Sequence, residues 1–150
     1  MKKYLYLALG VLLVGALVKA SSQDNPDAKT RTLNVKLSYA GSGTVDDKHK
    51  IFVFVFDSPE FITGGAFPIA SGSSATKDGT VAFANLTASP VYVATAYDPS
   101  GNYDGQSGPP PTGSSMGLYA KAPGKPEPVE IEAGKAVTID LPFDDTAKMP

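Results

Sequence analysis

The feature that most constrains the fold is the alternation of apolar and polar residues in short segments. Apolar side chains recur at every second position in 33–39 and in 137–143. A period of two places successive side chains on opposite faces of an extended strand. The segment 51–56 is apolar at every position, which is typical of a strand covered on both faces. Clusters of Gly, Pro, Asn, Asp and Ser separate the segments and predict turns.

This pattern predicts an all-β fold, an antiparallel β-sandwich of about seven strands, with 51–56 as its central strand. No helical period follows residue 20, although 57–79 could hold a short helix or an irregular edge segment lying on the core. The expected strands are 33–39, 51–56, 81–86, 91–97, 118–121, 129–132 and 137–143. The residues expected to face inward are Leu37, Val53, Val55, Phe83, Val93, Ile139 and Leu141.

The first 20 residues have the pattern of a secretory signal peptide. Lys2 and Lys3 precede an apolar run, and small residues before Ser21 fit cleavage after Ala20. The run, about 14 residues, is short of the ~20 that a spanning helix needs, so we expect cleavage rather than a membrane anchor. The sequence therefore predicts a signal peptide at 1–20, a flexible leader at 21–30, a sandwich domain at 31–145 and a tail at 146–150.

Charge and cysteine usage narrow the class of partner and the compartment. Without the three lysines of 1–20, 10 basic residues face 15 acidic ones, and no basic cluster remains. Phosphate binding needs clustered Lys and Arg, so we expect no nucleic-acid partner. The chain has no cysteine, so an exported form depends on its core, helped by any bound metal. We expect a secreted or periplasmic bacterial protein.

The longest interruption of the alternating pattern lies at 98–117, directly after the strand expected at 91–97. Nearly every position of this loop is Gly, Pro, Asn, Asp or Ser, and it is about 20 residues long. Most loops in compact domains have about 4–6 residues, and much longer ones are usually functional or disordered. We therefore expect the functional site here.

Oxygen-bearing side chains alternate at the start of this loop. Calcium takes six to eight oxygen ligands, and this spacing matches half of an EF-hand loop, without its terminal bidentate acid. Two interpretations stay open: a calcium site, or turns in which the aspartates accept hydrogen bonds from their own backbone. The candidate metal ligands are Asp98, Ser100, Asn102 and Asp104, and calcium is the one cofactor considered.

Tyrosines near the loop are the second candidate. Tyr97, Tyr103 and Tyr119 could form an aromatic surface for a protein or carbohydrate ligand, since tyrosine combines an apolar ring with a polar tip. The alternative is that these rings pack in the core and at its rim, as aromatic residues ordinarily do.

The residues needed for catalysis are scarce. There is no cysteine, and His49 is the only histidine, in a charged loop where we expect it to be solvated. No nucleophile-elbow pattern occurs. Asp46 and Asp47, like Asp144 and Asp145, are sequence neighbours, which point to opposite faces of an extended chain. We expect no enzymatic activity.

The order of these segments resembles an uncharacterised family of exported bacterial proteins. The resemblance covers roughly 33–143 and rests on Ile51-Phe-Val-Phe-Val-Phe-Asp-Ser-Pro-Glu-Phe61, on Val81-Ala-Phe83 and on Val91-Tyr-Val-Ala-Thr-Ala-Tyr-Asp98 with its Asp/Asn/Gly loop. It implies a transthyretin-like (prealbumin-like) sandwich, related in architecture to the immunoglobulin-like class. The loop here is more compressed than the family pattern and carries fewer oxygen acceptors.

Two functions remain after this reading. One is a non-catalytic accessory protein of the cell envelope or extracellular space that binds a protein or carbohydrate. The other is a structural subunit that self-assembles, or packs on a partner, through a sheet edge or the N-terminal leader. A hydrolase is the third and weakest reading.

Overall fold

The all-apolar strand β2 (Ile51–Phe56) lies inside a four-stranded sheet in the order β3-β2-β5-β6. The computed structural model describes residues 30–150, so the expected signal peptide and most of the expected leader lie outside the described residues. Antiparallel pairing joins β2 to β5 (Tyr92–Tyr97) over its whole length, from Ile51 opposite Tyr97 to Phe56 opposite Tyr92. The prediction of a central strand at 51–56 is confirmed.

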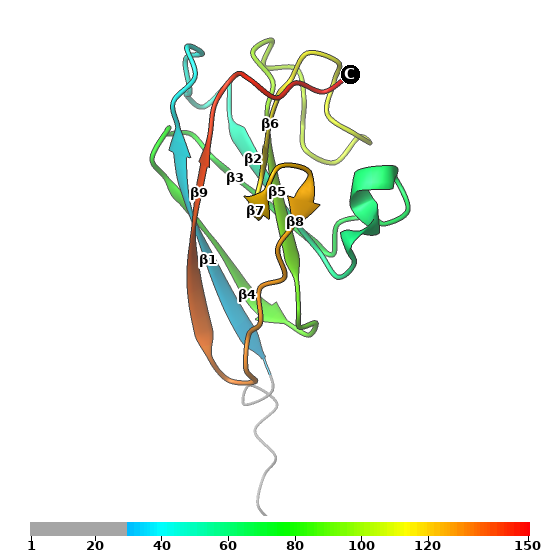
Figure 1. Ribbon diagram of the computed structural model, residues 1–150. Coiled ribbons are helices and arrows are strands. Elements are labelled where there is room, and N and C mark those ends of the chain that lie inside the picture. Colours follow the sequence, from blue (N-terminus) through cyan, green and yellow to red (C-terminus); the bar gives the residue numbers. More distant parts are fainter. Residues whose placement is uncertain (1–29) are drawn as a thin grey trace, which may run out of the picture.

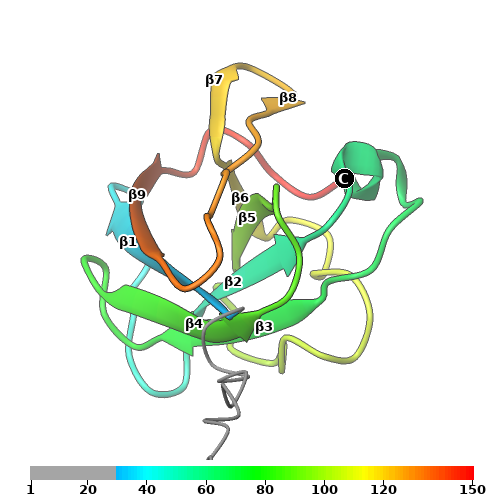
Figure 2. The same cartoon turned by 90° about the horizontal axis from the view of Figure 1, so that it is seen from below.

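A second sheet of three strands packs against the first, in the order β4-β1-β9 (Figures 1 and 2). Its middle strand, β1 (Arg31–Tyr39), pairs antiparallel with β4 (Thr80–Leu86). The last strand, β9 (Ala136–Phe143), runs parallel to β1 without a break in register, so the prediction of antiparallel pairing is wrong for this pair of strands. The two sheets hold seven strands between them, and no α-helix occurs in residues 30–150, so the all-β prediction is confirmed.

The core fills the space between the two sheets. Every residue predicted to face inward is buried there, with exposed fractions between 0% and 6%. Alternation decides this outcome, because one face of each strand must leave water for the sheets to pack. The inner face is completed by three aromatic rings at one end of the sandwich, those of Tyr39, Tyr97 and Phe143.

Two elements lie inside the segment 57–79. The first is a 3-10 helix, η2 (Pro59–Thr63), which begins after Ser58, whose side chain accepts a hydrogen bond from the Glu60 N–H. The second is β3 (Ala70–Ser74), an edge strand of small residues without the β-branched or aromatic side chains that signal strands. The prediction that this segment lies on the core is wrong for Phe67, which is 88% exposed.

The segments after the long loop also differ from the predictions. Strand β6 covers Ser115–Leu118, three residues earlier than expected, and a small hairpin of β7 (Ala120–Ala122) and β8 (Lys125–Pro126) projects from the sandwich (Figure 2). The strand expected at 129–132 is wrong: only Val129 forms a bridge, with Val91. Val129 and Ile131 are nevertheless buried. The alternation of apolar and polar residues there reflects which side chains are buried, although, apart from the Val129 bridge, the segment forms no strand with a hydrogen-bonded neighbour.

Replacing Ile139 with alanine tests the core. Ile139 is 5% exposed and lies opposite Val35 on β1, so its truncation removes packing atoms and leaves a cavity. We expect a loss of about 2–5 kcal/mol in the free energy of unfolding, measured by urea denaturation. The neighbouring Thr138 is exposed, and Thr138→Ala is expected to change stability by less than about 0.5 kcal/mol. Equal losses in the two variants would contradict the assignment of faces.

Candidate functional site

The long loop between β5 and β6 lies against the outer face of the four-stranded sheet. The ring of Tyr103 packs edge-on against Phe52, with centroids 5.2 Å apart, and its hydroxyl donates to the Gly108 carbonyl at 2.8 Å. Gly105 sits directly on Phe52: a Cβ at this position would lie 2.4 Å from the ring, and its φ of +77° is left-handed. Only glycine satisfies both conditions. The loop therefore acts as a cover for the sheet.

Asp98 closes the first turn of this loop. Its carboxylate is 4% exposed and accepts hydrogen bonds from the backbone N–H groups of Ser100, Asn102 and Tyr103 and from the Ser100 hydroxyl, at 2.6–3.1 Å. Burial opposes ionisation most strongly, but the four hydrogen bonds together outweigh it and hold the pKa of Asp98 below its ordinary value. A carboxylate has about four acceptor sites, and here its own loop occupies them.

Asp104 is turned toward a different part of the loop. It accepts from the Ser107 hydroxyl at 2.5 Å and from the N–H groups of Gln106 and Ser107 at 2.8 and 2.7 Å. The Ser107 hydroxyl is the main cause that lowers the pKa of Asp104 to about 2, followed by the two N–H groups. Asp98 and Asp104 thus each close their own turn.

Of the four candidate calcium ligands, Asp98, Ser100 and Asp104 consequently serve the loop through their side-chain oxygens, and Asn102 serves it through its backbone N–H. The Ser100 hydroxyl donates to Asp98, and the Asn102 N–H donates to Asp98 and to the Ser100 hydroxyl. Within residues 30–150, no three His, Cys, Asp or Glu side chains converge on one point. A calcium ion at this loop would have to replace hydrogen bonds that the aspartates already accept.

The three candidate tyrosines lie in different environments. Tyr97 is 2% exposed inside the sandwich, where its hydroxyl donates to the Thr44 carbonyl at 2.7 Å, so a ligand has no access to its ring. Tyr119 packs partly buried against the core. Tyr103 alone belongs to the cluster on the outer face. The structure does not bring these three rings together.

The outer face of the four-stranded sheet carries a second apolar cluster that the sequence indicated only in part. Phe54, Phe56 and the alanines of β5 are buried in it, and η2 contributes Phe61, whose ring stacks on Phe56 at 4.0 Å. The uninterrupted apolar run of 51–56 was the available signal, because such a strand needs a cover on both faces. The cluster continues into partly exposed side chains: Phe52, Tyr92, Tyr103, Met116 and Leu118.

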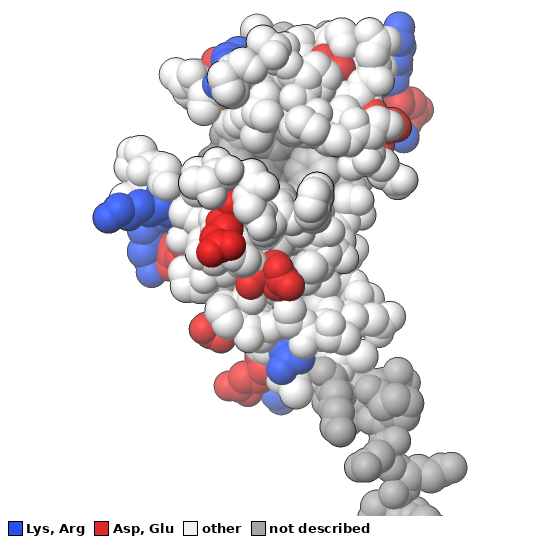
Figure 3. Space-filling view, turned by 90° about the vertical axis from the view of Figure 1, so that its right-hand side faces the viewer, with Lys and Arg blue, Asp and Glu red and all other residues white. Residues whose placement is uncertain are grey.

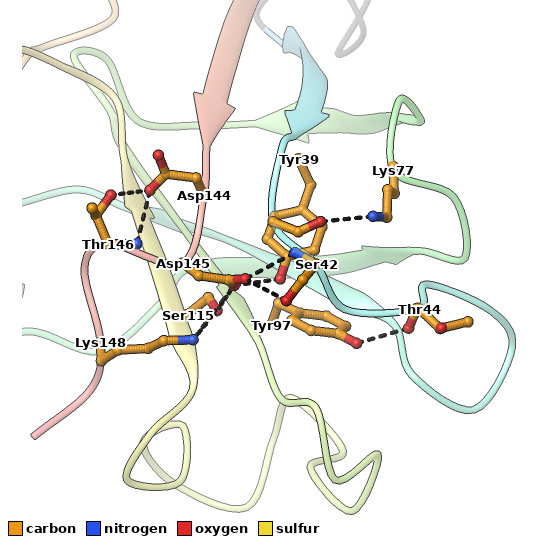
Figure 4. A network of polar contacts seen from close by, with 11 residues as sticks. Tyr39, Ser42, Thr44, Lys77, Tyr97, Ser115, Asp144, Asp145, Thr146 and Lys148 are labelled. Atoms are coloured by element: carbon orange, nitrogen blue, oxygen red, sulfur yellow. Dashed lines mark hydrogen bonds and ion pairs between the residues drawn. The ribbon is translucent and has the colours of Figure 1, made fainter.

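A polar network around Asp145 joins three distant segments at one end of the sandwich (Figure 4). Asp145 accepts from the hydroxyls of Tyr39 at 2.5 Å and Ser115 at 2.6 Å, and from the Ser42 N–H at 2.9 Å. These hydrogen bonds, led by that from Ser115, hold the pKa of Asp145 well below its ordinary value. Burial, followed by the contact with Asp145, raises the pKa of Tyr39 to about 12. No pattern in the sequence indicated this network.

The network fixes the chain after β9 beside β6. Lys148 donates to the Ser115 hydroxyl at 2.7 Å, and its Nζ lies 3.4 Å from Asp145 (Figure 4). Backbone bonds of 2.8 Å then join Met116 to Ala147 and Ser114 to Met149. The residues assigned to a tail therefore run along the sheet edge.

His49 lies in the neighbouring loop rather than in open solvent. Its Nδ1 is 2.8 Å from Asp46, and 26% of its side chain is exposed. Gly101 of the long loop packs on the ring, since a Cβ there would lie 2.8 Å from it. The histidine thus helps to hold the two loops together.

Comparison of the chain with models of protein families, with curated proteins and with solved structures finds no match in any of the three. The resemblance to the transthyretin-like family therefore rests on the sequence pattern and stays a prediction. Among residues 30–150, no helix has the length and apolarity needed to cross a membrane.

Replacing Asp145 with asparagine tests the network through its pH dependence. The pKa of Asp145 is lower in the folded chain than the ~3.9 of an unfolded aspartate, so its contribution is present above that pH and is lost as the pH falls through both values. We expect Asp145→Asn to lose about 1–3 kcal/mol at pH 7, because charged hydrogen bonds are removed. Urea titrations at several pH values should show this difference shrinking below about pH 4.

Asp47→Asn is the matched control, since Asp47 is an exposed aspartate elsewhere in the chain. It should leave stability at pH 7 nearly unchanged. A deficit for Asp145→Asn that is the same at pH 7 and pH 3 would contradict a role for the ionised carboxylate.

Thermal unfolding with and without calcium tests the metal hypothesis for the long loop. Because Asp98 already accepts four hydrogen bonds, we expect equal melting temperatures in millimolar calcium and in excess chelator. An ion that binds the folded state at a hundredfold excess over Kd would add about 2.7 kcal/mol and several degrees. A rise of that size, abolished by Asp98→Asn and retained in Asp144→Asn, would establish the calcium site instead.

Proposed function

We propose that this chain is a non-catalytic, exported β-sandwich that binds a polypeptide partner against the outer face of its four-stranded sheet. The observation that carries the proposal is Phe67, a large apolar side chain that is 88% exposed in the segment between η2 and β3. Ile62, in η2, and Ile69, directly before β3, are 47% and 43% exposed. Large apolar side chains exposed within one short segment favour a binding surface.

The segment that presents these side chains is held at both ends. Phe61 is anchored by its stack on Phe56, and the Gly64 and Gly65 N–H groups close η2 by donating to the Phe61 and Glu60 carbonyls. At the other end, the Ile69 N–H donates to the Val55 carbonyl at 2.8 Å. A surface fixed in this way loses little conformational freedom when a partner binds.

The charge around the segment favours a partner with basic residues. Asp57 and Glu60 are both exposed at the start of η2. On the side of the molecule where η2 lies, acidic side chains are visible near the middle, while acidic and basic side chains both occur toward the margins (Figure 3). A polypeptide with an apolar anchor next to Lys or Arg would complement this surface, whereas an anionic ligand would be repelled.

The chemistry of the buried hydroxyls supports a non-catalytic role. The Ser115 hydroxyl accepts a hydrogen bond from the Lys148 amine and donates one to Asp145, but Ser115 is fully buried. An external substrate therefore has no access to this hydroxyl.

The sandwich is further proposed to be transthyretin-like, as the sequence resemblance implies. Support comes from the arrangement of seven strands in sheets of three and four, with the first and last strands paired in parallel. The pattern of residues 1–20 supports export, to the periplasm or to the outside of the cell.

Selection from a displayed library of random peptides tests the proposed function. Immobilised protein should enrich peptides that combine an aromatic or aliphatic residue with neighbouring Lys or Arg. Phe67→Ser should abolish the enrichment without loss of stability, because the ring is exposed. Lys121→Ser, on the β7–β8 hairpin, is the matched control and should retain it. Equal enrichment by wild type and Phe67→Ser, or binding to an oligosaccharide array instead, would overturn the proposal.

A further inference from the structure

Residues that follow β9 cover the edge of β6. Met116 donates its N–H to Ala147, Gly113 donates to Met149, and Met149 donates to Ser114, each at 2.8 Å. Ser115 and Lys148 form a bridge between these hydrogen bonds. The backbone groups at this edge of the four-stranded sheet are therefore already paired, and a further strand cannot add here.

The two edges of the three-stranded sheet carry features that oppose strand addition. Strand β9 has Pro142, which lacks an N–H, and the exposed charge of Asp140. Strand β4 has Asn85 in a left-handed conformation, with φ of +59°, and its register with β1 shifts between Arg31 and Leu33. Proline, charge and local irregularity are the devices by which soluble proteins protect sheet edges.

Strand β3 has none of these protections. Its sequence is Ala-Ser-Gly-Ser-Ser, with no charge and no proline. Its register with β2 is regular from Val55 opposite Ala70 to Ile51 opposite Ser74. Ser71 and Ser73 are exposed, and β3 is the last strand on its side of the sheet.

The register identifies the backbone groups that β3 turns outward. The Val55 carbonyl accepts a hydrogen bond from the β3 side, so Val53 and Ile51, at alternate positions, also use their backbone groups toward β3. Their partners are Gly72 and Ser74. Ser71 and Ser73 lie between these hydrogen-bonded positions, and their N–H and C=O groups point away from β2.

We propose that β3 pairs with β3 of a second copy of this chain, antiparallel and two-fold symmetric about Gly72. Ser71 of each copy then lies opposite Ser73 of the other, and the two pairs exchange about four backbone hydrogen bonds. The four-stranded sheets of the two copies become one continuous sheet. This inference goes beyond the proposed binding function and does not depend on it.

The edge is chemically suited to a second copy of itself. A symmetric pairing places identical surfaces together, so any charge on β3 would face a like charge, and β3 has none. The side chains that meet across the junction are serines, which form favourable cross-strand hydrogen-bonding pairs. A shallow hollow of about 100 Å³ lies over β2 and β3, between Phe52, Ser71–Ser73 and Asp104–Gln106.

The size of the contact sets its strength. A pairing of one short strand buries less than the roughly 1,200 Å² of a standard stable interface. The dimer is therefore weak and forms in a concentration-dependent manner.

Single cysteines give a register-specific test, because the chain has none of its own. In the proposed pairing, residues 71 and 73 of opposite copies have Cα atoms about 5.5 Å apart, within the range for a disulfide. Residue 71 of one copy and residue 71 of the other are offset by a further two residues along the strand. Their Cα atoms therefore lie beyond the ~7 Å that a disulfide can span. An equimolar mixture of Ser71→Cys and Ser73→Cys chains should oxidise to a disulfide dimer, whereas neither chain alone, nor Thr138→Cys on β9, should do so.

Sedimentation velocity over a concentration series provides the second measurement. Wild type and the double variant Ser71→Thr/Ser73→Thr should dimerise as concentration rises. Ser71→Lys/Ser73→Lys should stay monomeric with an unchanged circular dichroism spectrum, since both side chains are exposed. Adding Phe67→Ser to the Ser71→Cys and Ser73→Cys chains should leave their cross-linking unchanged, which separates this inference from peptide binding. Equal cross-linking in all cysteine chains, or a monomeric wild type at millimolar concentration, would overturn the proposal.

Discussion

The structure depends on the need to cover β2 on both faces. Phe54 and Phe56 point away from the sandwich core, and they are buried only because another layer lies over them. That layer consists of η2 on one side and the long loop on the other, each contributing one aromatic ring, Phe61 and Tyr103. Leaving two phenylalanines in water would cost about 1.5–3 kcal/mol each. The loop and the 3-10 helix are therefore parts of the fold.

A second constraint comes from the absence of disulfides. A chain without cysteine has no covalent link between distant segments, and here hydrogen bonds to Asp145 supply a link instead. One carboxylate joins the end of β1, the following loop, the start of β6 and the chain after β9. The link is strong because the Asp145 carboxylate is charged, and hydrogen bonds to an ionised acceptor are stronger than those between neutral groups.

The elements that sequence predicted well are those with strict alternation or unbroken apolar character. The inward positions of β1 and β9 follow from period two alone, whereas β2 and β5 are buried on both faces and only the packing of the two sheets shows which face is inward. Strand β3 could not be found this way, because its residues are small and polar and its position is decided by pairing with β2. The same holds for Asp145: its partners come from segments far apart in the chain, so only the tertiary structure shows them. At the long loop, the sequence left two chemistries open, a calcium site or turns, and the hydrogen bonds that Asp98 and Asp104 accept are those of turns.

The parallel pairing of the first and last strands has a mechanical consequence. Because β1 and β9 point in the same direction, the start of one and the end of the other lie at opposite ends of the sandwich (Figure 1). A pulling force between Thr30 and the C-terminal end of β9 would load this ladder lengthwise, along its eight paired positions from Thr32 to Tyr39. Sliding two strands past each other strains many hydrogen bonds at once, whereas peeling them apart breaks one at a time. Residues 147–149, which are hydrogen-bonded to β6 and its preceding residues, lie beyond β9 and outside this loaded segment.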